Sequence, residues 1–361
     1  MNKNKVLEGL ISMNKIKAAV LGSTGYVGQE LTRLLIQHPQ VDIVFLGSKS
    51  YKEQSYSDIY ANFSKNIELI CYEDNVENIA SKVDVVFIAL PHGHASGKIN
   101  KNILSKTKII DLGADFRLND EKIYENWYET KHNCPDLLKT AVYGLCELNR
   151  NEIRTSNLIA NPGCYTTCSI LTLAPLLKED LIDENTIIID AKSGVSGAGR
   201  SLNLGTHFCE TNESIKAYKV ASHRHTPEIE QELSKISGKE IKLSFTPHLI
   251  PMNRGIISTC YASLKENISY DDVKSAYEKH YGNEFFIRLM KKGVFPETRW
   301  VKGSNFVDIG FSIDERTRRI IAIGALDNLM KGAASQAVQN MNIMFEMDES
   351  TGINQIPAFP I

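Results

Sequence analysis

Residues 16–28 are IKAAVLGSTGYVG, and this stretch decides the fold. A short β-rich run leads into a glycine turn, after which Val27, Leu31 and Leu34 recur at helical spacing until Pro39. Glycines between a strand and a helix let the backbone turn tightly and approach a pyrophosphate at the positive end of the helix. A turn needed only for packing is the alternative, but the flanking strand and helix favour a nucleotide site.

The next predicted strand indicates which dinucleotide binds. An acidic residue at its end would bind a free ribose 2′-hydroxyl, but the strand ends in Gly47-Ser48-Lys49-Ser50. Because a hydroxyl and a cation suit a 2′-phosphate, we predict NADP(H) rather than NAD; the alternative is that Lys49 is a solvated loop charge. The predicted cofactor contacts in these two segments are Gly22, Ser23, Thr24, Gly25, Tyr26, Val27, Gly28, Ser48 and Lys49.

Two kinds of sheet follow from the rest of the chain. Nearly all-apolar strands at 41–46, 83–90, 108–112 and 158–160 alternate with helices, which indicates a parallel sheet covered on both faces. After about Cys164 the pattern changes, with strands predicted at 186–191, 241–246, 256–264, 306–313 and 319–325 and fewer helices. The predicted fold is α/β: a Rossmann-type domain plus an inserted α+β domain with a mixed or antiparallel sheet. Residues 327–344 are predicted to form a helix that packs back on the first domain.

Composition excludes several classes of function. The 361 residues include 41 basic and 43 acidic side chains, so no global charge draws the chain to nucleic acid or an anionic membrane. No apolar run reaches membrane length and no signal-peptide core follows Met1, so we expect a cytoplasmic protein. Seven scattered cysteines without C-x-x-C spacing argue against a disulfide framework and structural zinc.

Cys164 is the candidate nucleophile. Asn161-Pro-Gly-Cys164 joins a predicted strand to an apolar helix, so the cysteine stands at a helix N-terminus, where unpaired N–H groups and the helix dipole favour the thiolate. A buried structural thiol is the alternative. Cys168, one turn further along, is expected to face the core.

His223 and His225 are the candidate partners of Cys164. We predict Thr226 as N-cap and Pro227 as the first helical residue, which puts both histidines in a loop before a helix. An imidazole that titrates near neutrality can move protons during collapse of a tetrahedral adduct. The two His-x-His pairs, at 92–94 and 223–225, are also possible metal ligands, but no defined zinc motif supports them, so no metal is predicted.

Two further segments can bind anions. Ser193-Gly-Val-Ser-Gly-Ala-Gly199-Arg200 is a small-residue loop whose N–H groups suit an anionic group or the wall of a nicotinamide pocket, with a flexible connector as the alternative. Arg117, in Asp115-Phe-Arg117, offers a guanidinium to phosphate or carboxylate, although an isolated arginine is usually a surface charge.

Together these strings resemble one family, the N-acetyl-gamma-glutamyl-phosphate reductases of arginine biosynthesis, and they run in family order from about Lys15 to the C-terminus. The matching strings are Gly22 to Gly28, Ala89-Leu-Pro91-His-Gly-His-Ala95, Asp111-Leu-Gly-Ala-Asp-Phe-Arg117, Tyr143-Gly-Leu, Asn161-Pro-Gly-Cys-Tyr165, Ser193 to Arg200, His223-Arg-His-Thr-Pro-Glu228, Pro247-His-Leu-Ile-Pro-Met-Asn-Arg-Gly255 and Asp327-Asn-Leu-Met-Lys-Gly-Ala-Ala334. Thr166 and Cys146 replace prolines of the family pattern, which leaves open where the helix after Cys164 begins.

The resemblance implies residue roles and a domain plan. Cys164 would be the nucleophile and His223 the acid/base, with Arg117, Ser193, Arg200 and His225 at the substrate and Pro91 and Asn328 at the cofactor. Residues 1–14 would be a tail, 15–163 and 327–361 the dinucleotide-binding domain, and 164–326 the catalytic and dimerisation domain of a homo-oligomer, dimer or tetramer. The small-molecule acyl phosphate would form a thioester on Cys164, which NADPH reduces while His223 protonates the oxyanion.

Three other functions stay open at this point. A related acyl-phosphate reductase, such as an aspartate-semialdehyde dehydrogenase, would share the fold and the thioester. A non-catalytic NADP-binding regulator would use Cys164 to sense oxidants. A metal-dependent hydrolase would use the His-x-His pairs.

Overall fold

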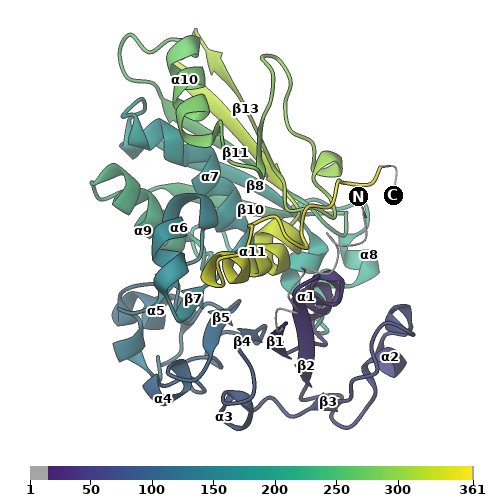
Figure 1. The fold of residues 1–361 in the computed structure, drawn as a ribbon. Coiled ribbons are helices and arrows are strands. Elements are labelled where there is room, and N and C mark those ends of the chain that lie inside the picture. The colour runs from purple at the N-terminus through teal and green to yellow at the C-terminus, as the bar shows by residue number, and fades with distance from the viewer. Residues whose placement is uncertain (1–14, 360–361) are drawn as a thin grey trace, which may run out of the picture.

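The computed structural model describes residues 15–359, which form two domains, each built on a sheet (Figure 1). The predicted tail, residues 1–14, lies outside the described residues. The first sheet contains β1 (Ile16–Leu21), β2 (Val41–Gly47), β3 (Cys71–Tyr72), β4 (Val85–Ile88), β5 (Lys108–Asp111), β6 (Val142–Tyr143) and β7 (Leu158–Ala160). All its pairs are parallel, in the order β3-β2-β1-β4-β5-β7-β6, as expected for a Rossmann-type domain.

Helices cover this sheet because its strands are apolar on both faces. They are α1 (Tyr26–Gln37), α2 (Tyr56–Ile59), α3 (Val76–Ile79), α4 (Lys101–Leu104), α5 (Glu121–Tyr128) and α6 (Cys146–Thr155), with short 3-10 helices at η2 (Ala61–Phe63) and η3 (Pro135–Leu137). The stripe predicted on α1 is buried, including Leu31, Leu34 and Leu35. The glycine turn, residues 22–28, therefore lies at the carboxyl edge of the sheet, where parallel sheets bind ligands.

The second sheet is mixed, as predicted. It contains β8 (Ile188–Gly194), β9 (Lys216–Ala217), β10 (Ser244–Ile250), β11 (Ile256–Ser263), β12 (Ile287–Leu289), β13 (Val307–Asp314) and β14 (Arg319–Leu326), in the order β12-β13-β14-β11-β8-β10-β9. Two pairs, β10 with β8 and β12 with β13, are parallel, and the other pairs are antiparallel. The remaining elements up to β14 are α7 (Cys164–Lys178), η4 (Glu184–Thr186), η5 (Val195–Ala198), η6 (Leu204–Thr206), α8 (Phe208–Thr211), α9 (Thr226–Ser237), α10 (Tyr270–Tyr281) and η7 (Thr298–Trp300).

Several predicted strands begin too early, by one or two residues at β4, β8 and β13 and by three at β10. We expected a strand over 241–246, but β10 begins at Ser244. The cause lies on α9, because Ser234 Oγ accepts the Ile241 N–H (2.9 Å) and Glu230 accepts the Leu243 N–H (3.1 Å). Side chains of the helix thus take the backbone donors that a strand would need.

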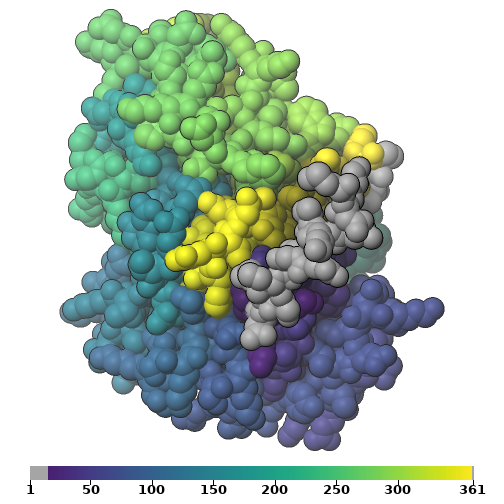
Figure 2. Space-filling view, viewed as in Figure 1, coloured from purple at the N-terminus to yellow at the C-terminus, as the bar shows by residue number. Residues whose placement is uncertain are grey.

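The chain returns to the first domain at its C-terminal end. A π-helix, η8 (Met330–Ala334), leads into α11 (Ser335–Met344), whose residues are all buried, and Met330, Val338 and Met341 join the core formed by β1 and α1. The predicted helix is therefore present and packs as expected, although it begins at Met330 rather than Asp327. Figure 2 shows this segment in yellow between the two domains.

A buried ion pair holds the C-terminal segment against the first domain. Lys331 Nζ lies 2.6 Å from Glu147 Oε1 on α6, and neither side chain is exposed to solvent.

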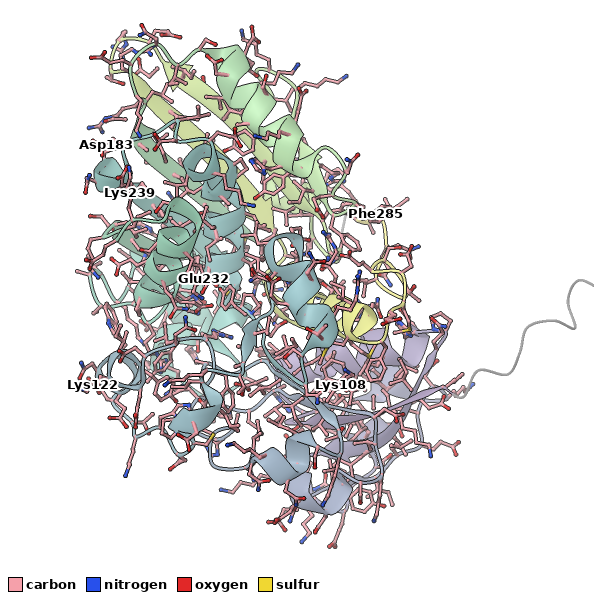
Figure 3. The ribbon with its side chains drawn as sticks, turned by 60° about the vertical axis from the view of Figure 1, so that its left-hand side comes forward. Lys108, Lys122, Asp183, Glu232, Lys239 and Phe285 are labelled. Atoms are coloured by element: carbon pink, nitrogen blue, oxygen red, sulfur yellow. The ribbon has the colours of Figure 1, made fainter. Side chains whose placement is uncertain are left out.

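The surface, in contrast, carries dispersed charges of both signs. Lys122 and Lys239, labelled in Figure 3, are exposed, and Lys239 pairs with Glu184 (2.9 Å). Within residues 15–359, no helix is both long and apolar enough to cross a membrane.

Candidate active site

The glycine turn needs glycine for two different reasons. Gly22 has a φ of +68°, and a Cβ there would lie 2.4 Å from the Ala89 carbonyl oxygen. Gly28 has an ordinary φ, but its Cβ would lie 2.2 Å from the Gly22 carbonyl oxygen. The first glycine therefore permits the backbone conformation, and the second permits α1 to pack against the turn.

The start of α1 has the chemistry of an anion site. Its N-cap, Gly25, provides no side-chain cap, and its first turn contains no acidic residue. The dipole and the free N–H groups of the helix end thus remain available for a pyrophosphate, so the predicted cofactor residues fit a dinucleotide. Tyr26, at the first helical position, is 39% exposed and lines a pocket beside the turn, whereas Val27 packs against the core.

Hydrogen bonds tie the turn to the end of β2. The Ser23 hydroxyl donates to the Gly47 carbonyl (2.8 Å), and the hydroxyls of Thr24 and Ser48 are 2.8 Å apart. Ser48 is buried at this junction, while Lys49 is exposed. The two residues predicted to select the cofactor therefore differ in exposure: Ser48 is buried and bonded to the glycine turn, whereas the Lys49 side chain is exposed to solvent.

Sequence reasoning missed a carboxylate at the same edge. Asp74 follows β3, and its Oδ1 accepts the Gly22 N–H (2.9 Å) and lies 2.2 Å from where a Cβ of Gly47 would be. Burial raises the pKa of Asp74 above its usual range. No local pattern could have indicated this residue, because the loop after a two-residue strand brings it to the turn.

Cys164 is the first residue of α7, which settles the helix start that the departures from the family pattern had left open. The neighbouring backbone is closely surrounded: a Cβ on Gly163 would lie 2.5 Å from His225 Nε2 and 3.0 Å from Arg117 Nη1. On the other side, a Cβ on Gly332 of η8 would lie 2.7 Å from Cys164 Cβ. Two glycines therefore let an imidazole, a guanidinium and the C-terminal segment all approach the cysteine.

A single cavity of about 660 Å³, the Cys164 cavity, collects most of the predicted chemistry. It opens between the two domains, and its lining includes Cys164, His223, His225, Arg117 and Ser193. These residues come from the helix start, the loop before α9, the segment after β5, and β8. The structure thus brings together five of the predicted catalytic and substrate residues.

The two histidines have different surroundings. Their ring centroids are 4.8 Å apart, and His223 also packs edge-on against Tyr165, Tyr218 and Phe245. His223 Nδ1 accepts the His225 backbone N–H (3.1 Å), which assigns the proton of the neutral ring to Nε2. His225 Nδ1 is buried and has no hydrogen-bond partner among the described residues.

The predicted cap of α9 is wrong by one position. The helix begins at Thr226 with His225 as its N-cap residue, so Pro227 is the second helical residue. His225 adopts helical dihedrals there, and the buried Thr226 hydroxyl has no partner among residues 15–359. The histidine nearer the helix is therefore held by the helix end rather than by a free loop.

The expectation that Cys164 is readily ionised is also wrong for this state of the protein. Burial raises the pKa of the Cys164 thiol to about 11, although the N–H of Tyr165 and the nearby Arg117 act in the opposite direction. Burial, reinforced by His225 and Lys219, lowers the pKa of His223 to about 2, and burial and Arg117 hold the pKa of His225 well below its usual range. At neutral pH the cavity therefore contains a thiol and two neutral imidazoles.

Arg117 is buried, and its guanidinium is held by the chain itself. Nε donates to the Asn161 carbonyl (2.8 Å) and Nη2 to the Leu112 carbonyl (2.9 Å), while Nη1 lies 3.5 Å from Glu228 Oε2. Burial disfavours its charge, but the nearby Glu228 carboxylate outweighs this and raises the pKa of Arg117. The arginine is a fixed positive charge beside Cys164.

Glu228 is a second residue that sequence reasoning left without a role. Its Oε1 accepts the Gly163 N–H (2.9 Å), the Tyr143 hydroxyl (2.7 Å) and the Thr166 hydroxyl (2.9 Å). Its side chain is fully buried. The available signal was its spacing, because a residue three positions after His225 on a helix faces the same side.

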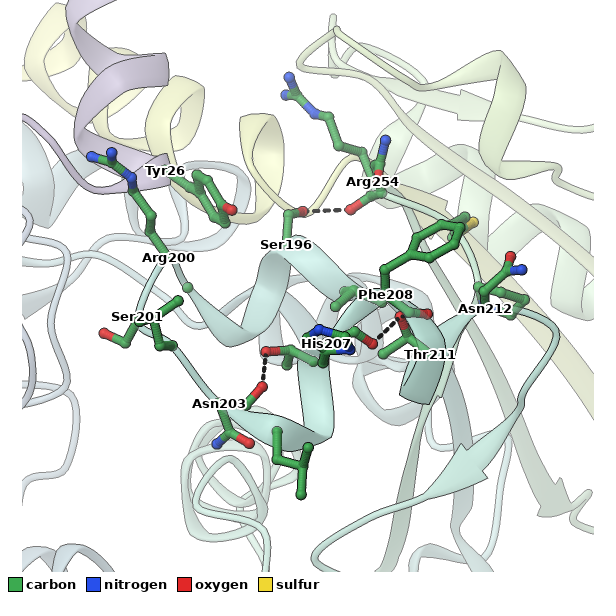
Figure 4. A pocket seen from close by; sticks show the side chains of 18 of the residues that line it. Tyr26, Ser196, Arg200, Ser201, Asn203, His207, Phe208, Thr211, Asn212 and Arg254 are labelled. Carbon is green, nitrogen blue, oxygen red and sulfur yellow. Dashed lines mark hydrogen bonds between the residues drawn. The ribbon is translucent and has the colours of Figure 1, made fainter. Parts of the chain in front are cut away.

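Besides the residues of the glycine turn and of the end of β2, three predicted residues lie outside the Cys164 cavity. Asn328 accepts the Gly255 N–H (2.7 Å) and donates to Ser196 Oγ (3.0 Å), so it borders the loop after β8. Pro91 is exposed in the loop after β4. Arg200 corrects our expectation of a substrate contact, because its loop carries it away from Cys164 to the glycine turn, beside the larger pocket in Figure 4.

Family models match both parts of the chain. A semialdehyde dehydrogenase NAD binding domain matches residues 17–156, and a semialdehyde dehydrogenase dimerisation domain matches residues 164–328. Among solved structures, aspartate semialdehyde dehydrogenase II from Vibrio cholerae, complexed with ASA, has a TM-score of 0.71 at 20% identity and covers 92% of this chain and 99% of that one. Aspartate semialdehyde dehydrogenase with NADP from Candida albicans has a TM-score of 0.67 at 19% identity, covering 92% and 98%. At these identities the likeness shows the fold.

Curated relatives are much closer in sequence. The N-acetyl-gamma-glutamyl-phosphate reductase of Lachnoclostridium phytofermentans is 56% identical over 96% of this chain and 100% of its own length. The enzyme of the same name from Campylobacter jejuni subsp. doylei is 55% identical over 94% and 98%. Identity at this level over nearly the whole length shows that the chain belongs to the N-acetyl-gamma-glutamyl-phosphate reductase family.

Proposed function

We propose that this chain catalyses the NADPH-dependent reduction of N-acetyl-gamma-glutamyl phosphate to N-acetyl-L-glutamate 5-semialdehyde and phosphate, a step of arginine biosynthesis, through a thioester on Cys164. The observation that carries the proposal is that Cys164, His223, His225 and Arg117 line one cavity between the two domains. Membership of the family supports the same substrate. A cytoplasmic location and a homo-oligomeric assembly, dimer or tetramer, are part of the proposal.

Substrate binding resolves the conflict between the raised pKa of Cys164 and its role as a nucleophile. An acyl phosphate brings negative charge into a cavity with two neutral imidazoles, and nearby negative charge favours the protonated ring. His225 is suited to accept the thiol proton, because its Nε2 lies against Gly163 beside Cys164. The thiolate then attacks the acyl carbon, and the carbon–oxygen bond to phosphate breaks as phosphate leaves with the electron pair.

Arg117 and Glu228 keep the nucleophile in place for this step. Glu228 fixes the Gly163 N–H, and therefore the start of α7, while its charge holds Arg117 beside the sulfur. The fixed guanidinium stabilises the negative charge on the sulfur without having to move. Ser193, on β8, lines the same cavity and is assigned to the substrate.

His223 is suited to stabilise the oxyanion of the second step. A bound NADPH supplies a hydride to the thioester carbon. Because His223 Nδ1 accepts a backbone N–H, its Nε2 carries the proton and can donate to the developing oxygen anion. Collapse of that adduct breaks the carbon–sulfur bond, releases the aldehyde and returns the thiolate, which recovers its proton from His225.

Phosphate-dependent reduction of NADP in the reverse direction tests the proposal. We expect turnover with N-acetylglutamate semialdehyde, dependence on inorganic phosphate, and loss of activity after alkylation of Cys164. Aspartate semialdehyde, assayed in parallel, tests the related reductase, and a preference for it would reject the proposed substrate. Absence of phosphate-dependent turnover with either aldehyde would favour a non-catalytic NADP-binding protein.

A further inference from the structure

Arg200 reaches from the second domain to the cofactor turn of the first. Its Nη1 donates to the Thr24 carbonyl (3.0 Å) and to the Tyr60 hydroxyl (2.7 Å), and its Nη2 donates to the Tyr51 hydroxyl (2.9 Å). The guanidinium also lies over both rings, 5.3 Å from the centroid of Tyr51 and 5.2 Å from that of Tyr60. Two aromatic rings and a carbonyl therefore fix the direction of an otherwise exposed side chain.

The partners of Arg200 are all uncharged. Among residues 15–359 it forms no ion pair, and the oxygens that accept from it are one carbonyl and two hydroxyls. Arg200 Nε has no hydrogen-bond partner among these residues, since only Nη1 and Nη2 donate. Arg200 is thus an oriented cation with donors to spare that is held at the turn without an ion pair among the described residues.

Arg200 also lies at the correct end of the sheet for the adenosine ribose. Thr24 connects it to the end of β2, since the Thr24 carbonyl accepts from Arg200 and the Thr24 hydroxyl is 2.8 Å from Ser48 Oγ. In dinucleotide-binding folds the end of this strand selects the group on the ribose 2′ position, and an arginine accommodates a 2′-phosphate there. Lys49 adds a second, exposed cation one residue after Ser48.

We propose that Arg200, carried by the second domain, binds the 2′-phosphate of NADP(H) and determines the preference for NADP(H) over NAD(H). The inference rests on the proposed function only for the identity of the cofactor. A guanidinium suits phosphate because its planar donors can bind two oxygens at once. It follows that the cofactor, once bound, connects the glycine turn to the loop after β8, so that nucleotide choice depends on both domains.

Nucleotide fragments test this without the reaction. Isothermal titration calorimetry of the full chain would compare adenosine 2′,5′-bisphosphate with 5′-AMP, which lacks the 2′-phosphate. For Arg200→Ala we expect binding of the bisphosphate to weaken by about 10- to 100-fold, the loss of one or two charge-assisted hydrogen bonds, with 5′-AMP changed less than about twofold. Arg200→Lys should be intermediate, because it keeps the charge and loses the two-oxygen contact.

Lys52→Ala is the matched control. Lys52 is an exposed cation near the same strand end, but it pairs with Glu73 (3.6 Å) and does not contact the turn. It should leave both affinities unchanged, whereas an equal loss in Lys52→Ala and Arg200→Ala would indicate a general charge effect and overturn the inference. Equal weakening of both nucleotides in Arg200→Ala would assign the residue to domain closure, which also overturns it.

The kinetic counterpart is the ratio of kcat/KM for NADPH to that for NADH. This ratio should fall in Arg200→Ala by about the same factor as the bisphosphate affinity, and an unchanged ratio would contradict the inference. Failure of the proposed function is distinguishable: the chain would then lack acyl-phosphate reduction in every variant, while the bisphosphate would still discriminate Arg200→Ala from the control.

Discussion

The glycine turn and the Cys164 cavity are built in opposite ways. The turn is one continuous segment whose N–H groups stay available for a ligand, and its geometry follows from glycines that are local in sequence. The cavity is assembled from residues between Leu90 and Leu249, and its titratable groups are shifted by burial away from the states that the reaction requires. A pre-formed site for the cofactor therefore stands beside a catalytic centre that is inactive until substrate charge enters it.

Cys164→Ser gives the sharpest separation of the two regions. We expect turnover to fall by about 10⁴-fold or more, since the nucleophile of a covalent mechanism is lost. NADPH affinity, measured by fluorescence titration, should change less than about twofold because the turn is a separate structure. Substantial residual reduction in this variant would count against a thioester.

The histidines test whether the cavity contains two proton roles or one. His225→Asn should slow acylation of Cys164, because it removes the proton acceptor beside Gly163. His223→Asn should retain acylation and slow reduction of the thioester, because it removes the Nε2 donor. Each loss should be about 10²- to 10³-fold, measured by single-turnover phosphate release and by NADPH oxidation. If both variants slow the same step equally, the separate assignments are wrong.

The outcome of the sequence predictions follows the same division. Residues 16–28 predicted a strand, a turn and a helix, and all three are present because short-range spacing and backbone conformation decide them. The ionisation of Cys164 could not be predicted from its place at a helix start, since burial of the thiol by segments distant in sequence, such as η8, outweighs the effect of the helix end. Arg200 was assigned to the substrate from the family resemblance, and its contact with the glycine turn could not be predicted because the path of its loop depends on the packing of the two domains.

The pH dependence of thiol alkylation measures that desolvation directly. A pKa of about 11 means that Cys164 is protonated at neutral pH, so the thiolate fraction of the free enzyme rises about tenfold for each pH unit below the pKa. The rate with iodoacetamide should therefore increase about 100-fold from about pH 7 to about pH 9, with Cys164→Ser as the blank for the other cysteines. A rate that no longer rises between about pH 7 and about pH 9 would show that the Cys164 thiolate is already formed. The Cys164 cavity would then be as well prepared for its ligand as the glycine turn.

Gly28→Ala and Gly25→Ala dissect the turn itself. At position 28 a Cβ would lie 2.2 Å from the Gly22 carbonyl oxygen, so we expect unfolding free energy to fall by about 1–3 kcal/mol, with cofactor affinity lost alongside. At position 25 the nearest contact would be 3.6 Å and φ is −77°, so a methyl group fits; because alanine is a poorer N-cap than glycine, unfolding free energy should still fall, but by less than about 1 kcal/mol. If Gly25→Ala binds NADPH more weakly, the pyrophosphate must lie close to the Gly25 backbone, because the methyl group fits in the protein without cofactor.

Thermal unfolding and NADPH titration of both variants separate these effects. Equal destabilisation by both variants would mean that the backbone is as tightly packed at Gly25 as at Gly28, which would contradict the presence of free space for a ligand at the start of α1.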